Sequence, residues 1–194
     1  MFNQKDAEHS IDLLLSHVKD IGKIKDLFIK SNHALLNILM EKEDDKYDEA
    51  RRDAILKLTY EENLERIKLL VKDKYDIDQG YREDFYKKPV YTAIKTCNLV
   101  IVEYFLSQSI NVNFRFHTHE LHDGDFKYIT PLDYAYYLLN SDDVYDEKER
   151  SLLKIINLLK ENGGLKANQI ATELTKDQKC RKDIRKNLIN VLKA

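Results

Sequence analysis

The central part of the chain alternates short apolar runs with polar breaks, at a spacing that predicts pairs of helices. The clearest pair covers residues 88–113. Pro89 is predicted to open a short helix, because a proline in the first turn lacks only an N–H that has no partner in the helix. A break follows at 96–98, and a second, more apolar helix is predicted from about Leu99 to Gln108.

A weaker copy of this pattern lies 35 residues earlier, between residues 48 and 78. Ala54 stands where Pro89 stands in the clear copy. Three separate landmarks keep the offset: residues 63–65 match 98–100, residues 69–71 match 104–106, and residues 76–78 match 111–113. A constant offset over three landmarks indicates an internal repeat of one helical hairpin.

A third copy begins at Thr130, in the segment TPLDYA. Thr130 is predicted to cap a helix that Pro131 opens. Two insertions interrupt this copy, one at 114–125 before it and one at 140–150 between its helices. The second insertion is charged and is predicted to lengthen the first helix or to form a solvated loop.

The second helix of the third copy is predicted around residues 153–159. It is expected to stop at Gly163 and Gly164, because a glycine adopts the left-handed conformation that commonly ends a helix. By helical spacing, Ile101 in the clear copy and Leu158 here are assigned to the core.

Both ends of the chain read as helices outside the repeat. Residues 1–46 form an N-terminal helical cap in this interpretation, with a first helix that Gly22 ends, and residues 168–194 form a C-terminal capping helix. Three apolar stripes support the N-terminal part: Ile11, Leu14, Leu15 and Val18; Ile24, Leu27 and Phe28; and Leu35, Leu36, Ile38 and Leu39. The whole chain, 1–194, is predicted to be a single domain.

Composition agrees with helices and disfavours several classes of protein. The chain has 194 residues, of which five are glycine and two proline, and 34% are charged with a formal net charge of only −2. Mixed charge argues against a nucleic-acid or membrane-surface protein. Two cysteines far apart, Cys97 and Cys180, fit a reducing compartment. With neither a signal peptide nor a long apolar run, the chain is expected to be cytoplasmic and not in a membrane.

The segment TPLDYA and the 35-residue spacing resemble the ankyrin repeat family, whose first helix opens with T-P-L-H-x-A and whose period is about 33 residues. The resemblance covers about 47–167, as three repeats of which the third is interrupted. Lys88 and Asp53 stand where the family has a capping threonine, and Cys97 and Glu62 where it has a glycine between the helices. The resemblance implies an all-α fold, an ankyrin-type solenoid of stacked helix-turn-helix repeats.

In that family the first helices and the turns line a concave surface that binds other proteins. The resemblance therefore implies a non-enzymatic protein–protein interaction module that binds another protein. A toxin-neutralising (immunity) protein and a host-directed effector both fit this description, and the oligomeric state stays open. Carried onto this chain, the partner-binding residues are Tyr60, Glu61, Asp84, Phe85, Lys87, Lys95, Thr96, Phe126, Lys127, Ile129, Tyr137 and Leu138.

The alternative is a metal-binding protein or enzyme organised around the His117–His122 loop. His117 and His119 would point to the same side of an extended segment, with His122 as a further ligand for zinc. No catalytic arrangement and no cofactor motif occurs in the sequence, and Cys97 reads as a structural thiol. Residues 176–194 carry seven Lys or Arg against two Asp. A nucleic-acid contact there is weighed against a water-facing capping helix, and the latter is favoured.

Overall fold

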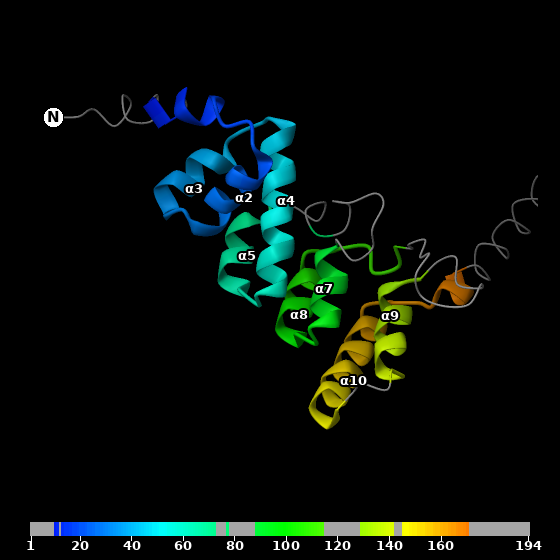
Figure 1. Cartoon of the computed structure of the whole chain (residues 1–194). Helices are drawn as coiled ribbons and strands as arrows, with labels where there is room; N and C mark the ends of the chain where they lie inside the picture. Colours follow the sequence, from blue (N-terminus) through cyan, green and yellow to red (C-terminus); the bar gives the residue numbers. More distant parts are fainter. Residues whose placement is uncertain are drawn as a thin grey trace, which may run out of the picture. The chain divides into compact units, whose positions relative to one another are not determined.

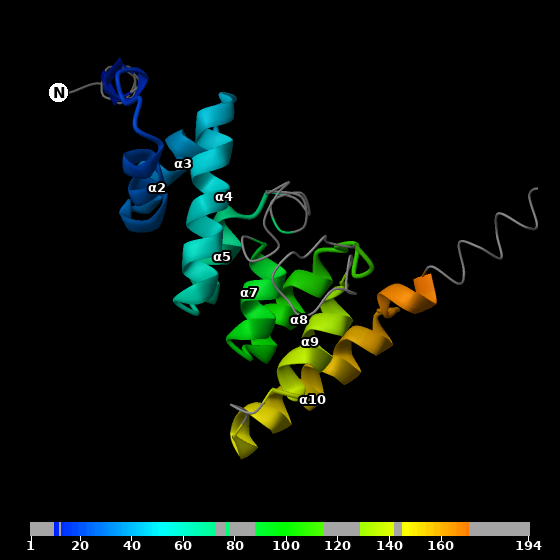
Figure 2. The same ribbon diagram turned by 45° about the vertical axis from the view of Figure 1, so that its right-hand side comes forward.

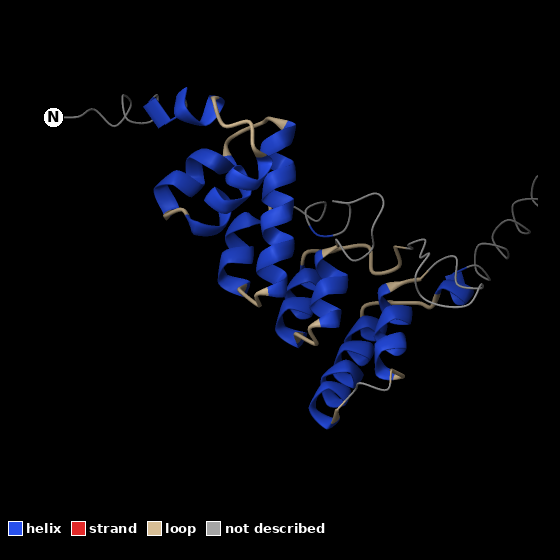
Figure 3. Cartoon of the chain, in the orientation of Figure 1, coloured by secondary structure: helices blue, strands red, loops and turns tan. Residues whose placement is uncertain are grey.

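The computed structural model describes residues 10–11, 13–72, 77, 88–114, 129–141 and 145–170. Every labelled element of this part is a helix, which confirms the all-α prediction (Figures 1 and 3). The chain divides into two compact units, 1–110 and 111–194. None of the helices in the described ranges has the length and apolarity that crossing a membrane requires.

Unit 1 (1–110) is built around one long helix. It contains α2 (Ile21–Lys30), α3 (His33–Met40), α4 (Asp45–Tyr60), α5 (Leu64–Leu70), α7 (Pro89–Lys95) and α8 (Leu99–Ser107). Helix α4 packs against α2, α5 and α7, and α7 packs against α8, as Figures 1 and 2 show. Because α4 touches three neighbours, its buried side chains Ala54, Ile55 and Leu58 join the N-terminal helices to the hairpins in one core.

The N-terminal helices differ from the predicted pattern at Gly22. This glycine lies inside the first turn of α2, so the prediction that it ends a helix is wrong. The Asp20 carboxylate accepts hydrogen bonds from the backbone N–H groups of Gly22 and Lys23, at 2.9 and 3.3 Å. An N-cap of this kind starts a helix, and it moves the break to residues before Asp20. Leu14, predicted to be on a buried stripe, is 71% exposed, whereas Leu15 is buried.

Arg66 of α5 joins the α4–α5 hairpin to the C-terminal end of α2 through hydrogen bonds. Its guanidinium donates to the Phe28 carbonyl oxygen from Nε at 3.0 Å and from Nη2 at 2.7 Å. Nη2 also lies 2.8 Å from the Ser31 carbonyl oxygen and 3.2 Å from the Ser31 hydroxyl. Burial lowers the pKa of the Arg66 guanidinium. One side chain thus satisfies carbonyls that the C-terminus of a helix leaves without partners.

The two hairpins of unit 1, α4–α5 and α7–α8, turn in the same way 35 residues apart. Glu62 and Cys97 both adopt left-handed backbone conformations, with φ of 59° and 57°. The backbone N–H of the next residue donates to the carbonyl oxygen five residues earlier. Asn63 donates to Leu58 at 2.9 Å, and Asn98 donates to Ala93 at 3.0 Å.

Each of these asparagines then caps the second helix of its hairpin. The side-chain oxygen accepts the N–H of the third residue on, Arg66 at 3.1 Å or Ile101 at 3.0 Å. The repeat seen in the sequence is therefore also a repeat of backbone geometry.

The first helix of the α4–α5 hairpin is longer than that of the α7–α8 hairpin, and one residue accounts for the difference. Helix α7 begins at Pro89, as predicted, with Pro89 in the first turn. Helix α4 carries Ala54 at the matching place and begins at Asp45. Proline inside a helix clashes with the preceding turn, whereas alanine is the best helix former. Replacing proline by alanine thus allows α4 to extend toward the N-terminus.

Unit 2 (111–194) contains α9 (Pro131–Leu139) and α10 (Asp146–Glu161), which pack against each other. The predicted cap of α9 is confirmed: the Thr130 hydroxyl accepts the Asp133 N–H at 3.2 Å, and the Asp133 carboxylate accepts the Thr130 N–H at 3.1 Å. The insertion at 140–150 behaves otherwise than predicted. Helix α9 stops at Leu139, and residues 146–150 lengthen the second helix, whose first turn gains Asp146, favourable at a helix N-terminus.

Helix α10 also corrects the core assignment. Leu158 is only half-buried, while Ile155 and Leu159 are fully buried. The predicted stop is confirmed, because Gly163 has φ 79° and the Gly164 N–H donates to the Leu159 carbonyl at 2.8 Å. A side chain on Gly164 would place its Cβ 2.7 Å from that same oxygen, so the close approach requires glycine.

Candidate functional site

The predicted partner-binding residues divide between described and undescribed parts of the chain. Those that the structure places are Tyr60, Glu61, Lys95, Thr96, Ile129, Tyr137 and Leu138. Outside the described residues lie Asp84, Phe85, Lys87, Phe126 and Lys127, together with the His117–His122 loop, Cys180 and the basic segment 176–194.

In unit 1 the ends of the two first helices lie side by side. Tyr60 is the last residue of α4 and Lys95 is the last residue of α7. The Asn98 amide of the second turn donates to the Glu62 carboxylate of the first turn, at 3.1 Å. Figure 3 shows both turns, drawn in tan, at the same end of their hairpins. We call Tyr60, Glu61, Lys95 and Thr96 the turn surface.

Tyr60 and Lys95 are the protruding members of the turn surface. Tyr60 is 68% exposed and Lys95 is exposed. Neither side chain forms a hydrogen bond or ion pair with another residue of the described ranges. The Glu61 carboxylate lies 3.8 Å from the Lys57 ammonium, in an exposed pair that adds little stability. Thr96 is half-buried, and its hydroxyl donates to the Ala93 carbonyl at 3.3 Å.

In unit 2 the predicted residues have mixed surroundings. Tyr137 is 38% exposed, and its ring stacks on Tyr134 with centroids 6.3 Å apart. Leu138 is half-buried. Ile129 is only 4% exposed, so its side chain cannot reach a partner and its assignment to a binding surface is wrong. The resemblance assigns Ile129 by its position in a turn, whereas its apolar side chain is of the kind that is usually buried.

Cys97 occupies a turn position with a left-handed backbone conformation. Its φ of 57° places it in the left-handed turn between α7 and α8, the position at which the weaker copy has Glu62. The thiol is half-exposed and lies 3.9 Å from the Lys95 carbonyl oxygen. Among the residues that the structure describes, no group of three or more His, Cys, Asp or Glu side chains converges as a metal site would require.

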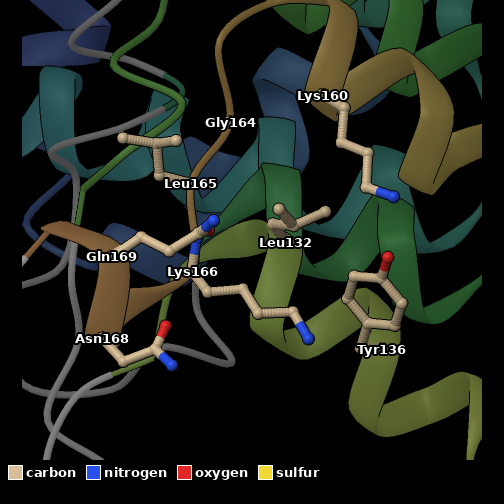
Figure 4. A pocket seen from close by; sticks show the side chains of 8 residues that line it. All are labelled: Leu132, Tyr136, Lys160, Gly164, Leu165, Lys166, Asn168 and Gln169. Carbon is tan, nitrogen blue, oxygen red and sulfur yellow. The ribbon is translucent and has the colours of Figure 1, made fainter.

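Unit 2 contains a hollow that the sequence did not point out. It lies between α9, α10 and the segment that follows α10, and has a volume of about 460 Å³ (Figure 4). The Lys166 ammonium nitrogen lies 3.9 Å from the centroid of the Tyr136 ring, and the Lys160 nitrogen lies 5.3 Å from it. We call this hollow the Tyr136 pocket. Its lining residues are Leu132, Tyr136, Lys160, Gly164, Leu165, Lys166, Asn168 and Gln169.

Hydrogen bonds hold the wall of the Tyr136 pocket in place. The Asn113 amide donates to the Gly163 carbonyl at 2.9 Å and accepts the Leu165 N–H at 2.7 Å. The Asp133 carboxylate accepts the Ala167 N–H at 2.8 Å. These bonds fix the segment after α10 against the start of α9.

A signal for this pocket was present in the sequence. Lys160 and Lys166 stand on either side of Gly163 and Gly164. The helix stop at Gly163 and Gly164 lets both lysines line one hollow. The sequence predicts that stop, but nothing in it identifies Tyr136 as the ring near both lysines.

In comparisons with known proteins, no family model, no curated protein and no solved structure matches the chain.

Proposed function

We propose that this chain is a non-enzymatic protein-binding module built from ankyrin-like helical hairpins, and that the turn surface contacts the partner. The observation that carries the proposal is the repetition within unit 1. Two hairpins with the same left-handed turn and the same asparagine cap present Tyr60 and Lys95 at equivalent, exposed helix ends.

The chemistry of these two residues suits recognition of a protein. Tyrosine offers a large contact area and one hydroxyl, and it loses little conformational entropy on binding. An exposed lysine beside it adds a charge that steers an acidic partner toward the surface. The Asn98–Glu62 hydrogen bond holds the two turns in register, so both side chains are presented from a rigid base.

Affinity capture of the full chain from its native cells, followed by mass spectrometry, tests the proposal. The test variant is Tyr60→Ala with Lys95→Glu. The matched control is Leu69→Ala with Val100→Ala, because these residues are 41% and 57% exposed on the second helices. We expect a specific partner that the wild type and the control retain and the test variant loses, since a tyrosine anchor typically contributes about 2 kcal/mol or more.

Retention of the same partner by the test variant would contradict the turn surface as the binding site. Loss of the partner in the control alone would move the site to the second helices. The identity of the captured protein would distinguish a toxin-neutralising role from the role of a host-directed effector.

A further inference from the structure

The Tyr136 pocket brings together two positively charged side chains, Lys160 and Lys166. Within the described part of the chain, neither the Lys160 nor the Lys166 ammonium pairs with a carboxylate. The carboxylate of Asp133 already accepts three bonds, from the Thr130 N–H, the Thr130 hydroxyl and the Ala167 N–H. It therefore holds the pocket wall and forms no ion pair with either lysine.

The two ammonium groups are close enough to repel each other. Because both lie near one ring centroid, their nitrogens are no more than about 9 Å apart, close to the Debye length of about 8 Å at physiological salt. The face of the Tyr136 ring attracts cations and gathers both side chains. An anion that accepts from both nitrogens beside the ring would reduce the repulsion and gain two charge-assisted hydrogen bonds.

The charge and the shape of the pocket select the kind of anion. A phosphate monoester carries about −1.5 to −2 charge at neutral pH, which matches two lysines. In Figure 4 the Tyr136 hydroxyl points toward the Lys160 ammonium, so it can donate a third hydrogen bond to the same group. Leu132 and Leu165 give an apolar wall for the organic part of an ester. The volume, about 460 Å³, is that of a typical small-molecule site.

We propose that the Tyr136 pocket binds a small phosphate monoester, whose phosphate lies between Lys160 and Lys166 and whose organic part contacts Leu132 and Leu165. This site is separate from the turn surface, which belongs to unit 1. It gives the chain a small-molecule ligand in addition to a protein partner.

Titration of the full chain with phenyl phosphate, followed by isothermal calorimetry, tests this proposal. Phenol serves as an uncharged probe with the same organic part. We expect saturable binding of phenyl phosphate and none of phenol. Lys160→Gln with Lys166→Gln should lower the affinity at least about tenfold, because both charge-assisted bonds are lost. Tyr136→Phe should lower it about three- to tenfold through the loss of one hydroxyl.

The matched control is Lys154→Gln, an exposed lysine on α10 that lies outside the pocket lining. It should bind phenyl phosphate as the wild type does. Far-UV circular dichroism checks that each variant is folded. Absence of saturable phenyl phosphate binding, equal binding of phenol, or equal affinity in the double lysine variant would overturn the proposal. So would an equal loss in Lys154→Gln, because the attraction would then be only that of general positive charge.

Discussion

Replacing Arg66 by methionine should reveal how unit 1 holds its N-terminal helices. The methionine keeps most of the apolar stem but removes the guanidinium, which donates to the carbonyls of Phe28 and Ser31 at 2.7–3.0 Å. Those carbonyls end α2, and no intrahelical donor can replace the guanidinium. The variant should therefore unfold more easily, although the helices themselves remain intact.

The size of the loss follows from the bonds that are broken. A hydrogen bond from a charged group contributes about 1.5–3 kcal/mol, and because Arg66 is partly exposed to solvent we take this as the total for its bonds. With a urea m value of about 1–3 kcal/mol/M, the midpoint of unfolding should fall by about 1 M. Arg66→Lys should show most of this loss, because a lysine ammonium cannot bridge two carbonyls in the way that the planar guanidinium does.

Urea unfolding followed by far-UV circular dichroism measures the effect. The control is Arg52→Met, because Arg52 lies on α4, is half-exposed, and makes no polar contact with the described residues. The control should change the free energy of unfolding by no more than about 0.5 kcal/mol. An unchanged midpoint for Arg66→Met, or an equal loss in Arg52→Met, would refute the idea that Arg66 joins α5 to α2.

Three further changes test the turns and the core. Cys97→Gly should raise the free energy of unfolding by about 0.5–1 kcal/mol, since glycine adopts φ of 57° without strain; lower stability in urea would be contrary to this reasoning. Gly164→Ala should lower the melting temperature, because its Cβ would lie 2.7 Å from the Leu159 carbonyl oxygen, and an unchanged temperature would rule the clash out. Ile101→Ala should cost about 2–5 kcal/mol in urea unfolding, and a cost below about 1 kcal/mol would place Ile101 outside the core.

The sequence predicts helix boundaries best where a residue's own backbone preference starts or ends the helix. Pro89 and Pro131 open α7 and α9 as expected, because proline has no N–H to lose and a fixed φ. Gly163 ends α10 for a similarly local reason. Asn98 begins α8, where the sequence pattern had already placed a break.

The predictions that failed do not share one cause. Gly22 looked like a break, but the Asp20 cap makes its position the first turn of a helix. The charged insertion at 140–150 could extend either neighbouring helix, and its residues 146–150, all of them exposed, extend α10. Leu158 and Leu159 differ by one residue in helical phase, which a short apolar run does not fix.

The candidate sites were predictable to different degrees. The 35-residue offset predicts that Tyr60 and Lys95 lie at matching helix ends, because residues separated by one repeat occupy equivalent positions. The sequence does not predict the Tyr136 pocket, because Lys160 and Lys166 meet the Tyr136 ring only through the packing of α9 against α10 and the segment after it. The spacing of residues alone does not give the ring that they share.

Site-specific photocrosslinking tests the proposed turn surface most directly. A benzophenone amino acid placed at position 60 or 95, in the full chain in its native cells, should crosslink to the same second protein. The same probe at position 69 or 100, on the exposed sides of the second helices, should give no such crosslink. Crosslinks to that protein from 69 and 100 but not from 60 and 95 would contradict the account.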